Sequence, residues 1–246
     1  TANSASVTYN GANQTASGFT ATGLVGGETE AVLTGVSASR TAKNAGSYTN
    51  TASGTDGNYN LSFVAGSLDI AKAALTATGN SSAVTYNGAN QSVSGFTVAG
   101  LQSSDTVADL SSVVAAGATA KNAGSYANTV TAGTETNYTV STMPGSLDIA
   151  KANATVTANG ATLTYNGANQ TASGFTASGL VGGESASVLS GVSASRTEKN
   201  AGTYTTTASG TDSNYNLTFV DGAIDRVTVV ACVSGRGASL NFVGGN

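Results

Sequence analysis

The stretch Tyr9–Gln14 reads Tyr-Asn-Gly-Ala-Asn-Gln, and the same six residues return at Tyr86–Gln91 and Tyr165–Gln170. A second motif, Lys-Asn-Ala-Gly followed by Ser or Thr and then Tyr, also occurs three times, and its closing tyrosines are 78 positions apart both times. A fixed period of this size indicates a tandem array of small domains. The unit to be explained is therefore one repeat, used three times.

A closing motif marks the borders of the repeats. Ser-Leu-Asp-Ile-Ala-Lys ends at Lys72 and again at Lys151, and Gly222–Asp225 begins the third counterpart. We therefore predict β repeats at 1–72, 73–151 and 152–226, followed by a divergent tail at 227–246. The Val-Thr-Val-Val run of the tail either adds a strand to the third repeat or begins a fourth.

Composition excludes several classes of protein. Only 9% of the 246 residues are charged, against about 25% in ordinary globular proteins, and the net charge is −4. Lys and Arg form no basic stripe, so nucleic-acid binding is not expected. The chain has no histidine and a single cysteine, Cys232, which leaves no usual zinc site and no triad with an imidazole base.

The chain also lacks the sequence features of membrane insertion and of a leader. No apolar run approaches the roughly 18–20 residues of a membrane span, so no membrane insertion is expected. The sequence starts with Thr1 rather than Met and shows no apolar leader segment. We interpret it as an excised or processed piece of something longer.

Local patterns within a repeat predict an all-β fold. Ala5–Tyr9 alternates before the turn dipeptide Asn10-Gly11, and Leu61–Phe63 and Leu217–Phe219 alternate apolar with polar residues as half-buried strands do. We expect three tandem small β-domains, each an immunoglobulin-like sandwich or a β-grasp-like sheet. One short helical turn per repeat, capped by an early carboxylate, is expected at 28–33, 105–110 and 184–189.

The segments between repeats carry no Pro-rich or Gly-Ser spacer. Ile70–Thr78 and Ile149–Thr157 are predicted to be continuous strands, and such short, stiff linkers favour an extended rod. Apolar residues that recur at matching places predict the core. In the first repeat they are Tyr9, Phe19, Leu24, Leu33, Val36, Tyr48, Tyr59, Leu61, Leu68 and Ile70, and in the second Tyr86, Phe96, Leu101, Leu110, Val113, Tyr126, Tyr138, Leu147 and Ile149.

Recurring polar residues are the candidates for chemistry. Lys43, Lys121 and Lys199, each followed by Asn, could form Lys–Asn isopeptide crosslinks if buried, but the adjacent Asn-Ala-Gly favours an exposed turn. Three sets of carboxylates recur, and we expect capping and turn roles for them. Calcium at the repeat junctions is the alternative, with Asp69 and Asp148 nearest to it. The sets are Glu28, Asp105 and Glu184; Asp56, Glu135 and Asp212; and Asp69, Asp148 and Asp225.

Tyrosine and asparagine also recur. Three tyrosines per repeat are interpreted as core rather than as a carbohydrate-binding row. Eight Asn-x-Ser/Thr sequons are about what this composition produces by chance, although Asn13, Asn90 and Asn169 share one repeat position and keep glycosylation as a minor hypothesis.

The ordered motifs Thr-Tyr-Asn-Gly, Ser-Gly-Phe, Gly-Leu-Val-Gly-Gly-Glu, Lys-Asn-Ala-Gly-Ser-Tyr, Asn-Tyr and Leu-Asp-Ile resemble the YDG/MBG-type repeats of very large bacterial adhesins. Many of those are filamentous-haemagglutinin-like proteins exported by two-partner secretion. The resemblance covers residues 1–226. It departs where the family often has Tyr-Asp-Gly, since all three copies have Asn (Asn10, Asn87 and Asn166), and again after Asp225, where Arg226–Cys232 replaces Ala-Lys-Ala. It implies an extracellular β-rich stalk module and no catalytic residues.

The sequence therefore predicts a non-catalytic structural stalk or spacer segment of a secreted or surface-attached bacterial adhesin, of the kind found in biofilms. The alternative is a direct binding module for an extracellular polysaccharide or a host or bacterial surface ligand. No enzyme activity is expected, and no residue is assigned as catalytic, cofactor-binding or metal-binding. No cofactor is expected beyond the junction calcium, and the expected partners are neighbouring repeats of the same long chain and, in the alternative, a cell-surface glycan. The expected place is extracellular or at the outer-membrane-associated cell surface.

Overall fold

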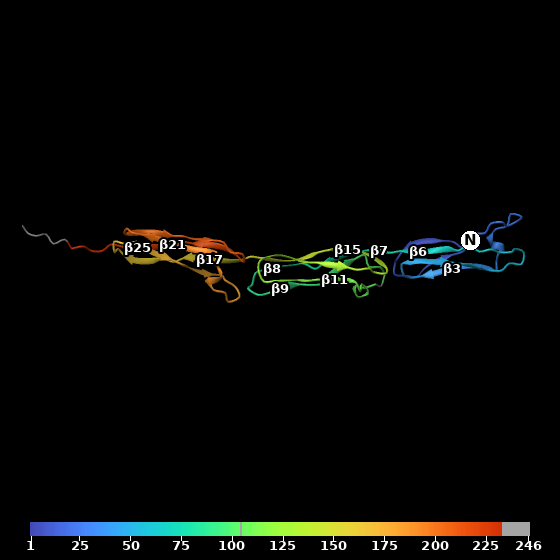
Figure 1. Ribbon diagram of the computed structural model, residues 1–246, viewed down its shortest axis with the longest axis horizontal. Coiled ribbons are helices and arrows are strands. Elements are labelled where there is room, and N and C mark those ends of the chain that lie inside the picture. The colour runs from blue at the N-terminus through green and yellow to red at the C-terminus, as the bar shows by residue number, and fades with distance from the viewer. Residues whose placement is uncertain (104, 233–246) are drawn as a thin grey trace, which may run out of the picture. The chain divides into compact units, whose positions relative to one another are not determined.

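The computed structural model describes residues 1–103 and 105–232. In these residues the protein is built from β-strands and three one-turn 3-10 helices, which confirms the all-β prediction (Figure 1). The chain forms two compact units: residues 1–84 with 90–149, and residues 85–89 with those from 150 onward. Among the described residues no helix has the length and apolar character needed to cross a membrane.

The third repeat consists of three sheets of three strands each. Two of its strand pairs, β17 with β24 and β18 with β25, are parallel, and the other pairs are antiparallel. The sheets, in spatial order, are β18 (Ala161–Thr164), β25 (Gly222–Val227) and β22 (Gly202–Thr206); β20 (Phe175–Ser178), β17 (Ala152–Ala158) and β24 (Tyr215–Val220); and β19 (Gln170–Ser173), β21 (Val192–Glu198) and β23 (Ala208–Gly210).

The second repeat has the same plan with shorter pieces. Its sheets are β13 (Gly124–Asn128), β16 (Gly145–Ala150) and β8 (Ser82–Thr85); β10 (Phe96–Ala99), β7 (Ala73–Gly79) and β15 (Tyr138–Met143); β11 (Val113–Ala115) and β14 (Val130–Ala132); and β12 (Ala118–Ala120) and β9 (Gln91–Val93).

The first repeat has two three-stranded sheets. They are β1 (Ala5–Thr8), β6 (Gly66–Ala71) and β4 (Gly46–Asn50); and β2 (Gln14–Ser17), β3 (Val36–Ala42) and β5 (Ala52–Gly54). The expected helical turn is present in every repeat as η1 (Glu30–Val32), η2 (Val107–Asp109) and η3 (Ala186–Val188).

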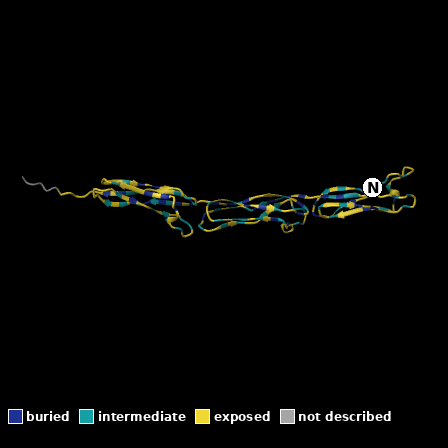
Figure 2. Ribbon diagram, in the orientation of Figure 1, coloured by how far each residue is buried: buried dark blue, intermediate teal, exposed yellow. Residues whose placement is uncertain are grey.

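The core of a repeat lies between its sheets. Along β7 every second residue is buried, as a strand with one face against the core requires (Figure 2). Ile70, Leu75 and Val113 come from three different sheets and belong to one apolar cluster. Because the described helical elements are only three residues long, the layers are sheets alone, and the sandwich rather than the β-grasp alternative describes the fold.

The linker strands differ from the prediction. Lys72 separates β6 from β7, and Lys151 separates β16 from β17, so neither segment is one continuous strand. β6 pairs with β1 and β4, whereas β7 pairs with β10 and β15. The chain therefore changes sheets at the lysine, while the buried residues of β6 and β7 belong to one apolar cluster.

Two further predictions have mixed outcomes. The strand at Leu217–Phe219 is confirmed within β24, whereas the one at Leu61–Phe63 is wrong, since that segment is unpaired. In the tail, Val227 ends β25, and Thr228–Cys232 form no strand. The rest of the predicted tail, 233–246, lies outside the described residues.

Candidate functional site at the repeat junctions

A tyrosine of the first repeat meets two residues of the second. Tyr9 directly follows β1, and its backbone N–H donates to the carbonyl of Ala71 at 2.8 Å. Its side chain is 2% exposed. The Tyr9 hydroxyl donates to the carboxylate of Asp105 at 2.8 Å, and the Tyr138 hydroxyl donates to the same oxygen at 2.6 Å. The two rings meet edge to face, with centroids 5.5 Å apart.

The second compact unit contains the same cluster. Tyr86 lies in the segment 85–89, and its hydroxyl donates to Glu184 at 2.5 Å. Tyr215, the first residue of β24, donates to the other oxygen of that carboxylate at 2.6 Å. The ring centroids of Tyr86 and Tyr215 are 5.4 Å apart, again edge to face. We call these two arrangements the tyrosine–carboxylate clusters.

Each cluster holds a loop as well as a carboxylate. The oxygen of Tyr138 accepts the backbone N–H of Gln102 at 2.9 Å, and that of Tyr215 accepts the N–H of Val181 at 3.0 Å. Each of these hydroxyls therefore donates and accepts, which satisfies a polar tip on a buried ring.

The electrostatics of the clusters keep the tyrosines protonated. Burial, and then the hydrogen bond to Asp105, raise the pKa of Tyr9 to about 12. The hydrogen bond to Glu184, and then burial, raise the pKa of Tyr86 to about 12. Burial is also the first cause of the raised pKa of Tyr138 and of Tyr215. These hydroxyls are therefore charge-assisted donors at neutral pH, and none is poised to act as a base.

The linker lysines add a second tie in both compact units. The ammonium of Lys72 donates to the backbone carbonyl of Glu135 at 2.6 Å, and that of Lys151 donates to the carbonyl of Asp212 at 2.6 Å. Glu135 and Asp212 occupy the same position in their repeats. The lysine just before β7 therefore donates to the turn that precedes β15, the parallel partner of β7. The lysine just before β17 donates in the same way to the turn that precedes β24.

The turn glycine brings the backbones close together. Gly11 has φ +77°, and a Cβ placed on it would lie 2.6 Å from the Cβ of Ser103. The equivalent Gly167 has φ +79° and would meet nothing within 4 Å. Both turns therefore need glycine for its positive φ. At Gly11 the missing side chain is needed as well, because another loop lies against it.

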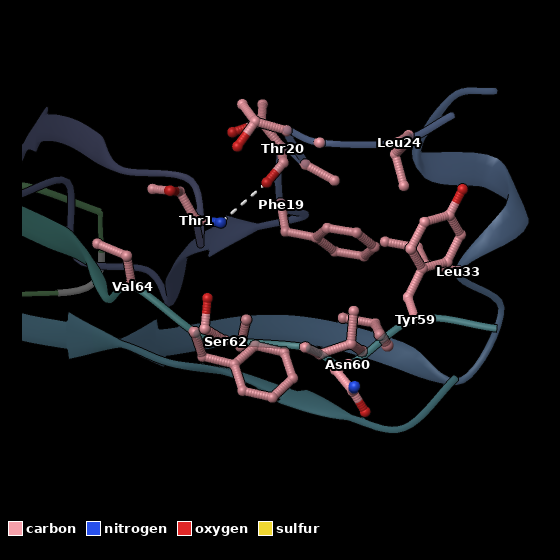
Figure 3. A pocket seen from close by; sticks show the side chains of 16 residues that line it. Thr1, Phe19, Thr20, Leu24, Leu33, Tyr59, Asn60, Ser62 and Val64 are labelled. Atoms are coloured by element: carbon pink, nitrogen blue, oxygen red, sulfur yellow. Dashed lines mark hydrogen bonds between the residues drawn. The ribbon is translucent and has the colours of Figure 1, made fainter. Parts of the chain in front are cut away.

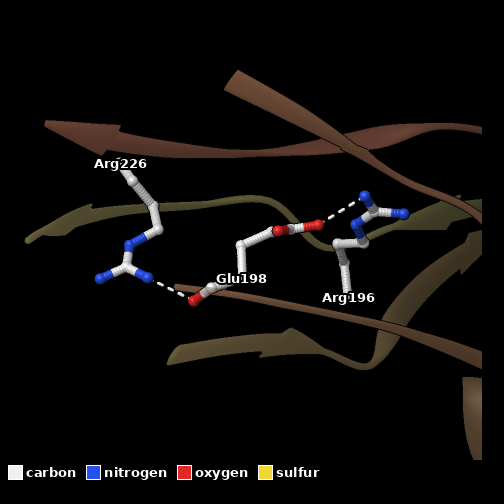
Figure 4. A network of polar contacts seen from close by, with 3 residues as sticks. All are labelled: Arg196, Glu198 and Arg226. Carbon is white, nitrogen blue, oxygen red and sulfur yellow. Dashed lines mark hydrogen bonds and ion pairs between the residues drawn. The ribbon is translucent and has the colours of Figure 1, made fainter. Parts of the chain in front are cut away.

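The third copy of the motif has a different environment. Tyr165 is 38% exposed, and the guanidinium of Arg226 lies over its ring at 5.7 Å. Arg226 occupies on β25 the place that Ile149 has on β16, and it is 3% exposed. Figure 4 shows its head against the backbone carbonyl of Glu198, to which it donates, while the Glu198 side chain pairs with Arg196 at 2.5 Å. The register thus corrects the sequence comparison: Arg226 replaces a core isoleucine.

The candidate residues from the sequence have structural places. Lys43, Lys121 and Lys199 are exposed, so the burial that an isopeptide crosslink needs is not met. Asp69 accepts hydrogen bonds from Ser47 and Ser67, which lower its pKa. Among the residues that the structure describes, no three His, Cys, Asp or Glu side chains lie close enough to share a metal.

Two predictions about carboxylates are refined. Asp56 and Asp212 accept backbone N–H groups two and three residues on, as turn residues do. Glu28, Asp105 and Glu184 are not the helix caps that the sequence predicts, because each lies one residue ahead of the N-cap position; they accept tyrosine hydroxyls instead. In the second repeat the cap is formed by Thr106 with Asp109.

The tyrosine prediction is confirmed for four residues of nine. Tyr9, Tyr86, Tyr138 and Tyr215 are core, whereas the tyrosines of the Lys-Asn-Ala-Gly motif are half-buried, and Tyr48 and Tyr126 donate to the backbone carbonyls of Asn44 and Asn122. The sequence reasoning missed the pairing of tyrosine with carboxylate. The available signal was that both residue types recur at fixed positions in each repeat.

The comparisons with known proteins identify the repeats. The family model described as MBG domain (YGX type) matches residues 1–69, 75–148 and 154–225, so the chain belongs to the MBG-domain family and carries three tandem copies. No sequence among the curated proteins matches the chain.

Three solved structures are similar to the chain. One is a Dpr2 Ig1-Ig2 complex with DIP-Theta Ig1-Ig3, at 11% identity over 76% of this chain and 74% of that one, with a TM-score of 0.28. Another is a Ca2+-stabilized adhesin with which an Antarctic bacterium binds ice, at 13% identity over 89% and 71%, with a TM-score of 0.29. The I9-I11 tandem from titin has 8% identity over 92% and 97%, with a TM-score of 0.24. At these TM-scores we base no argument on the similarities.

Proposed function

We propose that this chain is a non-catalytic stalk segment of a secreted or surface-attached bacterial adhesin, whose repeats space an adhesive part from the cell. Family membership supports a repeat region of this kind, and the twice-used tyrosine–carboxylate cluster supports the spacing role. Its partners are then neighbouring repeats of the same long chain, and its place is the outside of the bacterium.

The single observation that carries the proposal is that the recurring polar residues serve contacts between segments. Tyr9 and Asp105 are 96 positions apart, and Tyr86 and Glu184 are 98 apart, which is more than one repeat. A chain whose buried tyrosine hydroxyls tie one repeat period to the next is suited to transmit position and force. An active site would need polar groups that remain open to a substrate.

Small-angle scattering on the whole chain tests the spacing role. A compact globule of 246 residues would have a radius of gyration of about 18 Å. We expect a clearly larger value, and we expect it to change in the double variant Asp105→Ala/Glu184→Ala, which loosens both clusters. Tyr165→Ala is the matched control, since its ring lies in neither cluster. A value near 18 Å would contradict the stalk.

A glycan array separates the stalk from the alternative of a polysaccharide-binding module. A stalk should bind none of the arrayed glycans above the level of an unrelated β-domain. Specific binding by the chain alone, lost on changing an exposed residue such as Tyr165, would favour the binding module.

A further inference from the structure

Strands β15 and β24 lie at the edges of their sheets. β24 pairs with β17 on one side only, and β15 pairs with β7 on one side only. Each has six residues, whereas the other edge strands among the described residues have three to five. The equivalent residues of the first repeat, 59–64, form no strand and line a cavity of about 210 Å³ (Figure 3). Because a long unpaired edge can pair with another chain, β15 and β24 are the edges to compare.

The backbone groups on the open side of β24 are those of Leu217 and Phe219. The N–H of Ala152 donates to the carbonyl of Asn214 at 2.9 Å, and from this contact β17 runs parallel to β24. Successive residues of a strand direct their backbone groups to alternate sides. The groups of 216, 218 and 220 therefore face β17, and those of Leu217 and Phe219 face away from it, where each provides one donor and one acceptor.

The side chains of β24 also suit a second strand. Leu217 is half-buried, and Phe219 is 36% exposed at the rim of the core. β15 has the polar Thr142 at the position of Phe219. No residue of β24 is charged and none is proline, so the strand itself carries none of the usual devices that keep sheet edges apart. A six-residue uncharged segment rich in aromatic and β-branched residues is the type of sequence that pairs with copies of itself.

A second β24 fits this edge in a two-fold antiparallel register centred on Thr218. In that register Leu217 of each copy lies opposite Phe219 of the other, so the outward-facing donors and acceptors meet in pairs. The same register brings two apolar side chains together on the core face and forms a Thr–Thr pair on the outer face. Tyr215 lies opposite Asp221, and no two charged residues of the strand and its flanks are opposite each other.

We propose that the open edge of β24 is a self-association surface, on which β24 of a second copy of this chain pairs antiparallel. The contact uses the same residues on both copies and therefore closes at a dimer. The paired sheets then form one continuous sheet, in which the half-exposed Phe219 of each copy is covered by Leu217 of the other. The inference goes beyond the proposed function, because the partner is a separate chain and a binding module could pair in the same way.

The test is a charge exchange at Thr218, whose side chain is exposed in one chain and faces its own copy in the dimer. Sedimentation equilibrium of the whole chain should show reversible dimers. Thr218→Lys and Thr218→Glu should each raise the dissociation constant about tenfold or more, because like charges then meet across the two-fold axis. An equimolar mixture of the two variants should associate again, which also shows that both are folded. Ser141→Lys, at the same place on β15, is the matched control and should leave the constant unchanged.

Several outcomes of the sedimentation experiment would overturn the proposal. A chain that stays monomeric up to about 1 mM has no such surface. A dimer that neither charge weakens is held by another surface, and assemblies larger than a dimer contradict a contact that closes on itself.

Hydrogen exchange at the amides of Leu217 and Phe219 identifies what covers the edge. We expect exchange to be slow at high protein concentration and to become fast on dilution, because the dimer alone protects these amides. Slow exchange at every concentration would mean that a segment of the same chain covers the edge, and would overturn the proposal. Fast exchange at every concentration would contradict it as well.

Discussion

Tyr9 and Tyr165 stand in identical motifs, yet one is buried in a tyrosine–carboxylate cluster and the other is 38% exposed beside a buried arginine. Around both residues the sequence is Tyr-Asn-Gly-Ala-Asn-Gln, so the motif does not set their environment. What differs is the neighbour: Tyr9 has the carboxylate and tyrosine of a following repeat within reach. The comparison teaches that the motif is half of a contact, and that its contribution to stability depends on the other half.

The largest expected effect comes from removing the ring at the two places. Tyr9→Ala should destabilise the first compact unit by about 3–5 kcal/mol, because it leaves a cavity in the cluster and strips Asp105 of a donor. Tyr165→Ala should cost less than about 1 kcal/mol, as surface changes do. Calorimetric unfolding of both variants measures the difference, and equal losses would contradict it.

The buried arginine offers the next largest effect, with the opposite sign. Arg226→Ile should stabilise the third repeat by about 1–4 kcal/mol, because Arg226 is 3% exposed, bonds only carbonyl groups and leaves its Nε without a partner. The reverse change Ile149→Arg, at the same register position, should destabilise the second repeat. Urea unfolding checks both, and a less stable Arg226→Ile would mean that contact with Tyr165 outweighs the cost of desolvation.

Substitution of the turn glycines is expected to change stability by a smaller amount. Gly11→Ala and Gly167→Ala incur the same backbone strain of about 1 kcal/mol, since both have φ near +78°. Gly11→Ala should cost roughly 1–3 kcal/mol more, because its new methyl group collides with Ser103. The midpoint of thermal unfolding gives the difference, and matching shifts would show that the loop yields freely.

The last effect is a pH dependence, and it is confined to alkaline conditions. Tyr9 and Tyr86 have a folded pKa of about 12 against an ordinary value of 10. Because the folded value is raised, their contribution is complete below pH 10 and is lost as the pH rises through 12. The melting temperature should therefore fall between pH 10 and 12, and fall less in Tyr9→Phe/Tyr86→Phe, which is the control for the other titrating groups. If the melting temperature fell equally in both proteins, the tyrosine–carboxylate clusters would not be the cause of the pH dependence.

Much of the fold was predictable because it depends on local and periodic features. The β class, the turn at Asn10-Gly11, and the single helical turn after position 28 follow from alternation and turn chemistry that each repeat carries within itself. Leu68 and Leu147 are fully buried, as their alternation in Leu-Asp-Ile predicts. The failure at Leu61–Phe63 has a clear cause: the pattern was right for a strand, but a strand also needs a partner.

The candidate site was less predictable, since its partners are about a hundred positions apart. Nothing near Tyr9 in the sequence indicates Asp105. The place of Arg226 could have been found by counting, because Asp225 matches Asp148 and the next residue, Arg226, therefore matches the core residue Ile149. By itself the sequence determined three β repeats and the alternation that buries residues such as Leu68 and Leu147, because period and alternation act over a few residues. Only the tertiary structure decided which tyrosines become core and where the linker changes sheets, because burial and hydrogen bonding depend on the segment that packs against each of them.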